Sequence, residues 1–133
     1  MGKLIIPIDI ATKVLDYVKE KLPEESCGLL AGSDIKVTIE IPITNQLHSP
    51  IKYFMDPMEL FKALEMIETL KLDLLGIFHS HPKGPPRPSE TDIKEFLYPG
   101  VATIICYPDS NNWKMKAFLI EHDCYTEMEL VIG

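Results

Sequence analysis

Residues 76–92 read GIFHSHPKGPPRPSETD, and the expectations for the rest of the chain follow from this stretch. Its apolar beginning has the length of a β-strand, and a proline-rich turn follows it. Because successive side chains of a strand alternate between its two faces, His79 and His81 point to one face and Ser80 points to the other. Pro82 has no N–H to donate, so the strand ends directly after the second histidine. The sequence therefore predicts a strand that presents two imidazole groups together.

The residues after the turn supply a third candidate metal ligand. Zinc favours imidazole nitrogens and carboxylate oxygens, and a catalytic zinc ion usually has three protein ligands and one open position. The candidate set is His79, His81 and Asp92. Ser89 and Asp92 also fit a capping box, in which each side chain satisfies a free backbone N–H at a helix start. We favour metal binding because the joint pattern His-x-His-Pro, six residues, Ser-x-x-Asp is rare by chance.

This pattern resembles the JAMM signature of the MPN+ family of zinc isopeptidases. The family signature also has a glutamate upstream, in an element close to Glu-x-Cys-Gly, and residues 25–30 read ESCGLL. The order of the predicted strands and helices is similar to a minimal MPN domain over most of the chain. The resemblance implies two catalytic residues, Glu25 and Ser89, and one zinc ion on His79, His81 and Asp92.

The resemblance also implies the roles of the catalytic side chains. Zinc lowers the pKa of a bound water to about 7, and Glu25 is expected to accept a proton from it and deliver that proton to the departing amine. Acid–base catalysis of this kind is commonly worth about 10²- to 10⁴-fold in rate. Ser89 is expected to donate its hydroxyl to the developing oxyanion, a contact whose loss costs about 10²- to 10³-fold. Glu24 is the alternative base, but the family pattern places the glutamate two residues before Cys-Gly, which favours Glu25.

The composition is typical of one globular domain, and we expect residues 1–133 to form it. A net charge of −7 gives no basic footprint for nucleic acid. The apolar runs are far shorter than the roughly 20 residues that span a bilayer, and the first residues lack the features of a signal peptide. With three cysteines and no CxxC pair, reduced thiols and a cytoplasmic location are expected. Cys27 is left open, because an extended segment from Glu25 would place its thiol on the face of that carboxylate.

Hydrophobic periodicity and turn residues predict the elements, and the fold class is α/β or α+β with a mixed central sheet flanked by helices. The resemblance sharpens this to the MPN fold, which is similar to that of cytidine deaminases. Residues 3–8 are expected to be an edge strand, and residues 101–106 a central one. Asp9 is expected to cap the first helix, and Asp56-Pro57 to begin the second, whose core stripe is Leu60, Phe61, Leu64, Ile67 and Leu70. The other expected strands span 27–32, 35–43, 52–55, 74–81, 113–119 and 124–132. A short helix is expected to begin at Ser89-Glu90-Thr91-Asp92 and to continue to Leu97.

The expected substrate also follows from the resemblance. The resemblance implies hydrolysis of the bond after the C-terminal Gly-Gly of a ubiquitin-like modifier, usually an isopeptide bond to lysine, and such an extended tail can add to a sheet edge. A small stand-alone chain resembles the prokaryotic members, which act on small archaeal modifiers or bacterial sulfur-carrier proteins. One alternative is a hydrolase that releases cysteine or another amino acid from a sulfur-carrier protein. Another is a non-catalytic MPN scaffold. A nucleobase deaminase is excluded because its His-x-Glu and Pro-Cys-x-x-Cys elements are missing. The sequence predicts no nucleic-acid or membrane partner, and it leaves the oligomeric state open.

Overall fold

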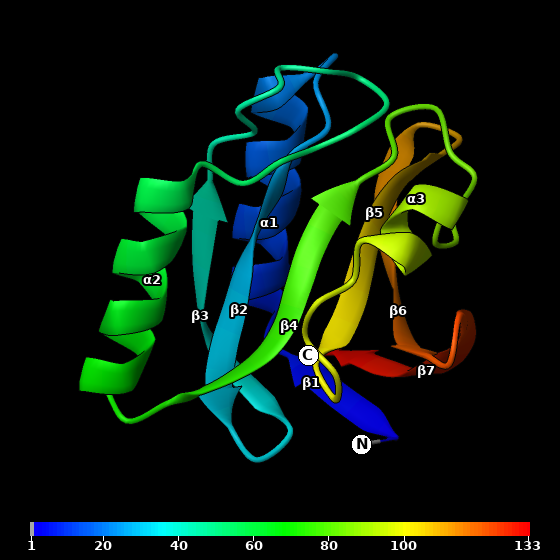
Figure 1. Cartoon of the computed structure of the whole chain (residues 1–133). Helices are drawn as coiled ribbons and strands as arrows, with labels where there is room; N and C mark the ends of the chain where they lie inside the picture. Colours follow the sequence, from blue (N-terminus) through cyan, green and yellow to red (C-terminus); the bar gives the residue numbers. More distant parts are fainter. Residues whose placement is uncertain (1) are drawn as a thin grey trace.

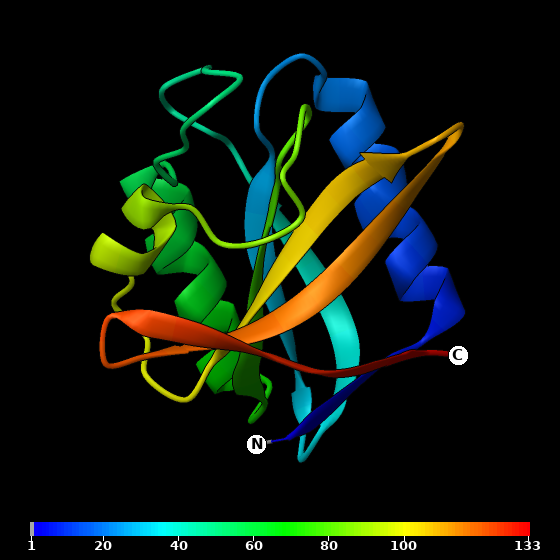
Figure 2. The same ribbon diagram turned by 90° about the vertical axis from the view of Figure 1, so that its right-hand side faces the viewer.

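The structure is a computed structural model that describes residues 2–133, so Met1 lies outside the described part of the expected domain. Figures 1 and 2 show a curved sheet with helices packed on it. In chain order the elements are β1 (Lys3–Ile6), α1 (Ile8–Lys21), β2 (Cys27–Ser33), β3 (Lys36–Ile43), α2 (Pro57–Thr69), β4 (Asp73–Ser80), α3 (Glu90–Lys94), β5 (Ala102–Asp109), β6 (Asn112–Glu121) and β7 (Cys124–Ile132). The fold class is the expected one, a mixed sheet flanked by helices. Within residues 2–133, none of the helices combines the length and the apolar character needed to cross a membrane.

The strands pair in the order β1-β3-β2-β4-β5-β6-β7, and the sheet closes because β1 also pairs with β7. The β1 strand is parallel to both of its neighbours, β3 and β7. The prediction that residues 3–8 form an edge strand is therefore wrong. A local pattern could not reveal this pairing, which joins Lys3–Ile6 to residues 129–132 at the other end of the chain. The expected hairpin of β2 and β3 and the central place of β5, between β4 and β6, are confirmed.

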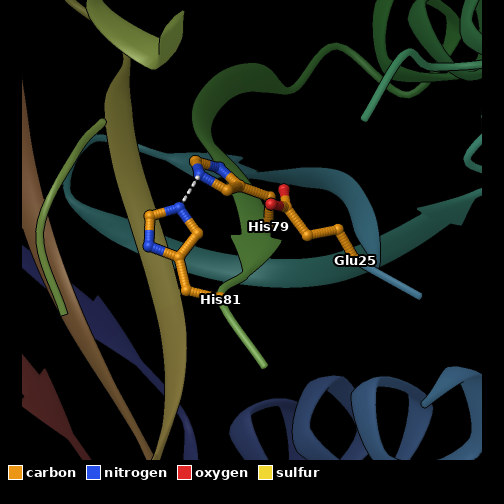
Figure 3. A group of neighbouring side chains, drawn as sticks. All are labelled: Glu25, His79 and His81. Atoms are coloured by element: carbon orange, nitrogen blue, oxygen red, sulfur yellow. Dashed lines mark hydrogen bonds between the residues drawn. The ribbon is translucent and has the colours of Figure 1, made fainter. Parts of the chain in front are cut away.

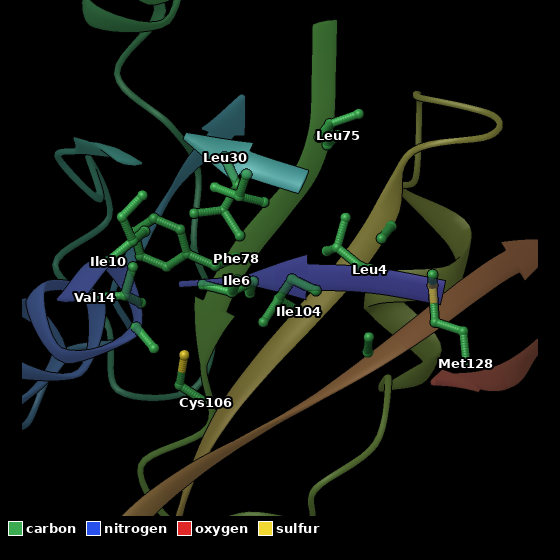
Figure 4. Packing of buried hydrophobic residues seen from close by; sticks show 14 of the residues in the cluster. Leu4, Ile6, Ile10, Val14, Leu30, Leu75, Phe78, Ile104, Cys106 and Met128 are labelled. Atoms are coloured by element: carbon green, nitrogen blue, oxygen red, sulfur yellow. The ribbon is translucent and has the colours of Figure 1, made fainter. Parts of the chain in front are cut away.

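Two clusters of buried side chains lie on opposite faces of the sheet. Leu30 and Phe78 pack in the cluster that includes α1, whereas Leu29 and Ile77 pack in the cluster that includes α2. Neighbouring residues of one strand thus serve different clusters, as the alternation of side chains requires. Figure 2 shows α1 and α2 on opposite sides of the sheet, and Figure 4 shows the packing of the first cluster. Both faces of the central strands are consequently covered.

Helix α2 begins as predicted but buries a narrower stripe. The Asp56 side chain accepts hydrogen bonds from the backbone N–H groups of the first turn, and Pro57 occupies the first helical position. Ala63 and Ile67 are buried, whereas Phe61 is 61% exposed and Leu70 is 52% exposed. The prediction that Phe61 and Leu70 belong to the core is wrong. The helix packs on β3 and β4 through one narrow face, which reaches fewer positions than the apolar pattern suggests.

Three local boundaries also differ from the prediction. Helix α1 begins at Ile8 with Pro7 at its N-cap, so Asp9 lies in the first turn, where its charge suits the helix dipole. Residues 52–55 are not a strand, because only an isolated bridge between Asn45 and Met55 forms there. Helix α3 ends at Lys94 rather than at Leu97, and Leu97 is 78% exposed. Short apolar segments of this kind lack the partner strand or packing surface that would extend an element.

Gly28 permits the close approach of β2 to its neighbours. A Cβ atom at this position would lie 2.4 Å from ring carbons of Phe78 and 2.6 Å from the carbonyl oxygen of Ile41. We expect Gly28→Ala to lower the free energy of unfolding by about 1–3 kcal/mol, the usual cost of overpacking a core. Urea denaturation measures this loss. Gly2→Ala is the matched control, because a Cβ there meets nothing within 4 Å, and equal midpoints for the two variants would contradict the prediction.

Candidate metal centre

His79 and His81 lie at the end of β4, and their backbone is held on both sides. The Ser80 N–H donates to the carbonyl of Ser26 at 3.0 Å, and the His81 N–H donates to the carbonyl of Cys106 at 2.9 Å. Ser80 faces away from the histidines, and its Oγ accepts a 2.8 Å hydrogen bond from the N–H of Ser26. The predicted alternation is confirmed. Both histidines are buried, with exposed fractions of 1% and 6%.

Three ligand atoms converge at this point. The Nε2 atoms of His79 and His81 are 3.1 Å apart, and Oδ2 of Asp92 lies 3.1 Å from the first and 3.2 Å from the second. A tetrahedral ion with bonds of about 2.0–2.1 Å to nitrogen and oxygen places its ligand atoms about 3.3–3.4 Å apart. The observed spacing is close to this value. The three atoms can therefore hold one metal ion after a shift of a few tenths of an ångström.

The hydrogen bond of His81 supports the same conclusion. Its Nδ1 atom lies 2.8 Å from the carbonyl oxygen of Pro85, which can only accept a hydrogen bond, so Nδ1 carries a proton. In the neutral ring, Nε2 then presents a lone pair toward the nitrogen of His79 and the carboxylate of Asp92. Nε2 of His81 and Oδ2 of Asp92 are thus two acceptors 3.2 Å apart, and a proton or a metal ion between them would relieve their repulsion. The donor set thus fits a metal ion.

The pKa shifts of these groups have the same origin. Burial acts to raise the pKa of Asp92, but hydrogen bonds with His79 and His81 outweigh it and hold the pKa below its usual range. Burial acts to lower the pKa of His81, but its contacts with Asp92 and the Pro85 carbonyl outweigh burial and raise the pKa. Both shifts have one cause, the attraction between the carboxylate of Asp92 and positive charge beside it. A metal ion would supply that charge in place of protons.

The capping box places the carboxylate of Asp92. The N–H of Asp92 donates to Oγ of Ser89 at 3.0 Å, and the N–H of Ser89 donates to Oδ2 of Asp92 at 2.9 Å. This is the same Oδ2 that faces the two histidines. The sequence allowed two interpretations of Ser89 and Asp92, helix capping and metal binding. The two are therefore compatible. Because the cap uses only an acceptor site of the Ser89 hydroxyl, its proton remains able to donate.

Glu25 approaches the histidines from the segment before β2. Its side chain extends toward the two rings (Figure 3), and a carboxylate oxygen and the ring nitrogens lie within 4.8 Å of one another. The residue is 5% exposed, and desolvation raises its pKa to about 8. Glu24, the alternative base, instead contacts Nδ1 of His48 at 3.2 Å, and that imidazole is 64% exposed. Of the two glutamates, Glu25 is the one beside His79 and His81.

Cys27 lies next to His79 in the sheet but is not a reactive thiol. The two residues are register partners of β2 and β4, which places both side chains on one face. The Cys27 thiol is fully buried and donates to the carbonyl of Ile43 at 3.3 Å. Burial raises its pKa to about 12, so the thiol keeps its proton at neutral pH. The thiol contributes to packing and hydrogen bonding there.

Sequence reasoning missed two residues of this region and an adjoining cavity. Tyr53 stacks on His79, and the buried side chain of Asn45 ties together the loop that carries Tyr53. A cavity of about 410 Å³ lies beside the centre, and its lining includes His79, Ser89 and Asp92. Most of its other lining is apolar and includes Ile51, Phe54, Leu60, Phe96, Leu97 and Tyr98. Asn45 and Tyr53 lie in the loop between β3 and α2, where no periodic pattern marks them, so the sequence carried no signal for their place at this site.

Comparison with known proteins identifies the family. Residues 7–120 match the family model described as prokaryotic homologs of the JAB domain. The chain belongs to this family. The resemblance to JAMM and MPN proteins that residues 76–92 indicated is thereby confirmed, for a small member of prokaryotic type.

Curated relatives of this JAB-family chain cover nearly its whole length. A desampylase of Haloferax volcanii is 34% identical over 98% of this chain and 97% of its own. A desampylase of Pyrococcus furiosus is 42% identical over 97% of this chain and 90% of its own. A CysO-cysteine peptidase of Mycobacterium tuberculosis is 28% identical over 93% of this chain and 87% of its own. All three names describe hydrolytic enzymes.

Solved structures agree with the JAB-family assignment. A protein of Desulfitobacterium hafniense matches with a TM-score of 0.88 at 30% identity, over 98% of this chain and 92% of its own. A JAB1/MPN domain protein of Archaeoglobus fulgidus matches with a TM-score of 0.60 at 25% identity, over 96% of this chain and 99% of its own. A structure described as a JAMM metalloprotease-like zinc site matches with a TM-score of 0.59 at 25% identity, over 96% and 97%. These likenesses confirm the expected MPN fold.

Proposed function

We propose that this chain is a zinc-dependent isopeptidase that cleaves after the C-terminal Gly-Gly of a ubiquitin-like modifier. The observation that carries the proposal is the meeting of two imidazole nitrogens and one carboxylate oxygen at 3.1–3.2 Å, with the buried carboxylate of Glu25 beside them. The names of the relatives support a hydrolytic enzyme, and two of them are desampylases.

We assign the zinc ion to Nε2 of His79, Nε2 of His81 and Oδ2 of Asp92. When bound, a zinc ion supplies Lewis acidity that brings the pKa of a water to about 7 and polarises a carbonyl group. The protein atoms that hold it are already oriented. The Pro85 carbonyl holds the ring of His81, and the N–H of Ser89 holds the carboxylate of Asp92.

Glu25 is placed to move the proton. Burial makes the ionised carboxylate of Glu25 a stronger proton acceptor than a glutamate at the surface, and a bound zinc ion would favour that ionised form. Glu25 takes one proton as the water oxygen bonds to the scissile carbonyl carbon. It returns that proton to the nitrogen as the carbon–nitrogen bond breaks, so the amine leaves neutral. The hydrogen bonds from Glu25 to the carbonyl of Ser49 and from Asn45 to the carbonyl of Glu25 hold its backbone during these steps.

Ser89 is placed to stabilise the negative charge on the carbonyl oxygen. Its Oγ accepts from the N–H of Asp92, which leaves the hydroxyl proton free to donate. Ser89 is exposed and lines the cavity beside the metal centre, so a substrate carbonyl can reach it. A donor of this kind is worth about 10²- to 10³-fold in rate.

The release of cysteine from a sulfur-carrier protein is the second candidate, and the likeness to a CysO-cysteine peptidase favours it. It requires the same centre, because a cysteine attached through its amine to a C-terminal carbonyl is also held by an amide bond. A non-catalytic scaffold has less support, since the three proposed ligands and a buried glutamate lie close together.

We further propose that residues 1–133 act as one domain and work in the cytoplasm. The closed sheet, which joins Lys3–Ile6 to residues 129–132, supports one domain. The free state of Cys27, Cys106 and Cys124 supports a reducing compartment.

A substrate panel tests the proposed function. The purified protein is incubated with one Gly-Gly-terminated modifier in three forms: joined to a lysine side chain, fused linearly, and carrying a C-terminal cysteine. We expect cleavage of the lysine-linked form, loss of cleavage with a zinc chelator and recovery when zinc is added back. Cleavage of the cysteine adduct alone would replace the proposal with the second candidate. A protein that holds one zinc ion per chain and cleaves none of the three forms would favour the scaffold.

A further inference from the structure

The two histidines of the metal centre are held in different ways. A histidine that binds a metal through one nitrogen almost always donates the other ring N–H to a partner, which fixes the orientation of the ring. His81 has such a partner, because its Nδ1 lies 2.8 Å from the carbonyl oxygen of Pro85. The Nδ1 atom of His79 is buried and has no hydrogen-bond partner among residues 2–133. Some other contact must fix the ring of His79.

Tyr53 makes that contact. Its ring stacks on the imidazole of His79, with the centroids 4.8 Å apart and the planes 28° from parallel. Offset stacking at this separation is favourable, and a flat neighbour limits rotation of the imidazole about its own axis. Tyr53 comes from the loop between β3 and α2, far in sequence from β4. A loop thus orients a ligand that stands on a strand.

Asn45 determines where the Tyr53 ring lies. Its buried side chain donates to the carbonyl of Lys52 at 3.0 Å and accepts from the N–H of Phe54 at 3.1 Å. These two residues flank Tyr53, so the backbone on both sides of the ring is fixed by one amide. The same amide donates to the carbonyl of Glu25 at 3.0 Å. One side chain therefore links the loop of Tyr53 to the segment of the proposed base.

We propose that Tyr53 is a positioning residue for His79 and that Asn45 holds Tyr53 in place. Neither residue is among the proposed ligands, and both act through the orientation of the imidazole. The inference rests on the proposed role of His79 as a zinc ligand. Nδ1 of His79 has no polar partner among residues 2–133, so the stacked ring of Tyr53 orients this imidazole, as the Pro85 carbonyl orients that of His81.

Zinc affinity, measured by competition with a chelator, tests the proposal without relying on turnover. We expect Tyr53→Ala to weaken zinc binding by about 10- to 100-fold, the usual effect of losing a partner that orients a ligand. Tyr53→Phe keeps the ring and should bind zinc as the wild type does. Tyr53→Leu keeps apolar bulk without a flat ring, and we expect it to resemble Tyr53→Ala. It serves in place of Tyr53→Ala if that variant does not fold.

Two further variants separate positioning from general stability. Asn45→Ala leaves the aromatic ring in the chain but frees its loop, and we expect zinc binding weaker than in the wild type. Tyr125→Ala is the matched control. It removes the edge-on contact between Tyr125 of β7 and Phe118 of β6, which lies outside the metal centre. Its zinc affinity should be unchanged. In the cobalt-substituted protein, the visible absorption should shift in Tyr53→Ala and not in Tyr125→Ala.

The outcomes distinguish this inference from the function on which it rests. Wild-type zinc affinity in both Tyr53→Ala and Tyr53→Leu, with zinc lost in His79→Ala, would overturn the positioning role and leave the metal centre intact. Zinc retained in His79→Ala would overturn the assignment of the ligand, and with it the proposed centre.

Discussion

Replacement of Glu25 by glutamine is expected to lower turnover by about 10²- to 10⁴-fold while the zinc content stays at the wild-type level. Glutamine has the size of glutamate but cannot accept the proton from the attacking water. The zinc should remain because its proposed ligand atoms, which lie 3.1–3.2 Å apart, belong to His79, His81 and Asp92. Glu25 is not one of these ligands. The turnover number on a lysine-linked Gly-Gly substrate and the zinc content of the purified variant measure the two effects.

Glu24→Gln is the matched control for this variant. Glu24 is adjacent in sequence, and its carboxylate contacts His48 rather than the histidines of β4. We expect its turnover to equal that of the wild type. If Glu25→Gln were as active as Glu24→Gln, the base would have to be another group, and the proposed proton transfer would be wrong.

His81→Ala is expected to release the metal. The variant loses one of the three converging ligand atoms and also the hydrogen bond from Nδ1 to the Pro85 carbonyl. Loss of a residue that only orients a ligand usually lowers metal affinity by roughly 10- to 100-fold. Because His81 is itself a proposed ligand, the zinc affinity of His81→Ala should fall further. Zinc bound per chain after dialysis against a weak chelator measures the effect, and cleavage should be lost with the metal.

His48→Ala is the control for metal release. His48 lies in a loop at a positive φ of 49°, its side chain is 64% exposed, and its partner is Glu24. We expect it to retain one zinc ion per chain. A His81→Ala protein that also retains one zinc ion would remove His81 from the ligand set.

Several features that were predicted correctly depend on contacts within a few residues. The alternation of His79, Ser80 and His81 follows from the pleat of one strand. The capping box of Ser89 and Asp92 spans three residues, and its two hydrogen bonds form as the local pattern implies. The beginning of α2 at Asp56 is of the same kind. In each case the residues that interact are neighbours in the chain, so their identities are sufficient.

The local sequence could not decide whether Glu24 or Glu25 is the base. Both are acidic, both precede β2, and only the family pattern separated them in the sequence. The structure separates them physically, because Glu25 is buried beside the histidines and Glu24 meets His48 near the surface. Burial depends on which other segments cover a residue, and that information is spread along the chain.

By itself, the sequence determined the strand with its two histidines, the capped carboxylate that follows, and through the family pattern the glutamate upstream. Only the tertiary structure decided that β1 and β7 close the sheet, that α2 leaves Phe61 exposed, and that Tyr53 rests on His79. The physical reason is that these contacts join residues far apart in the chain. They are selected by packing and by hydrogen bonds such as those of Asn45, which impose no periodic pattern on the residues that make them.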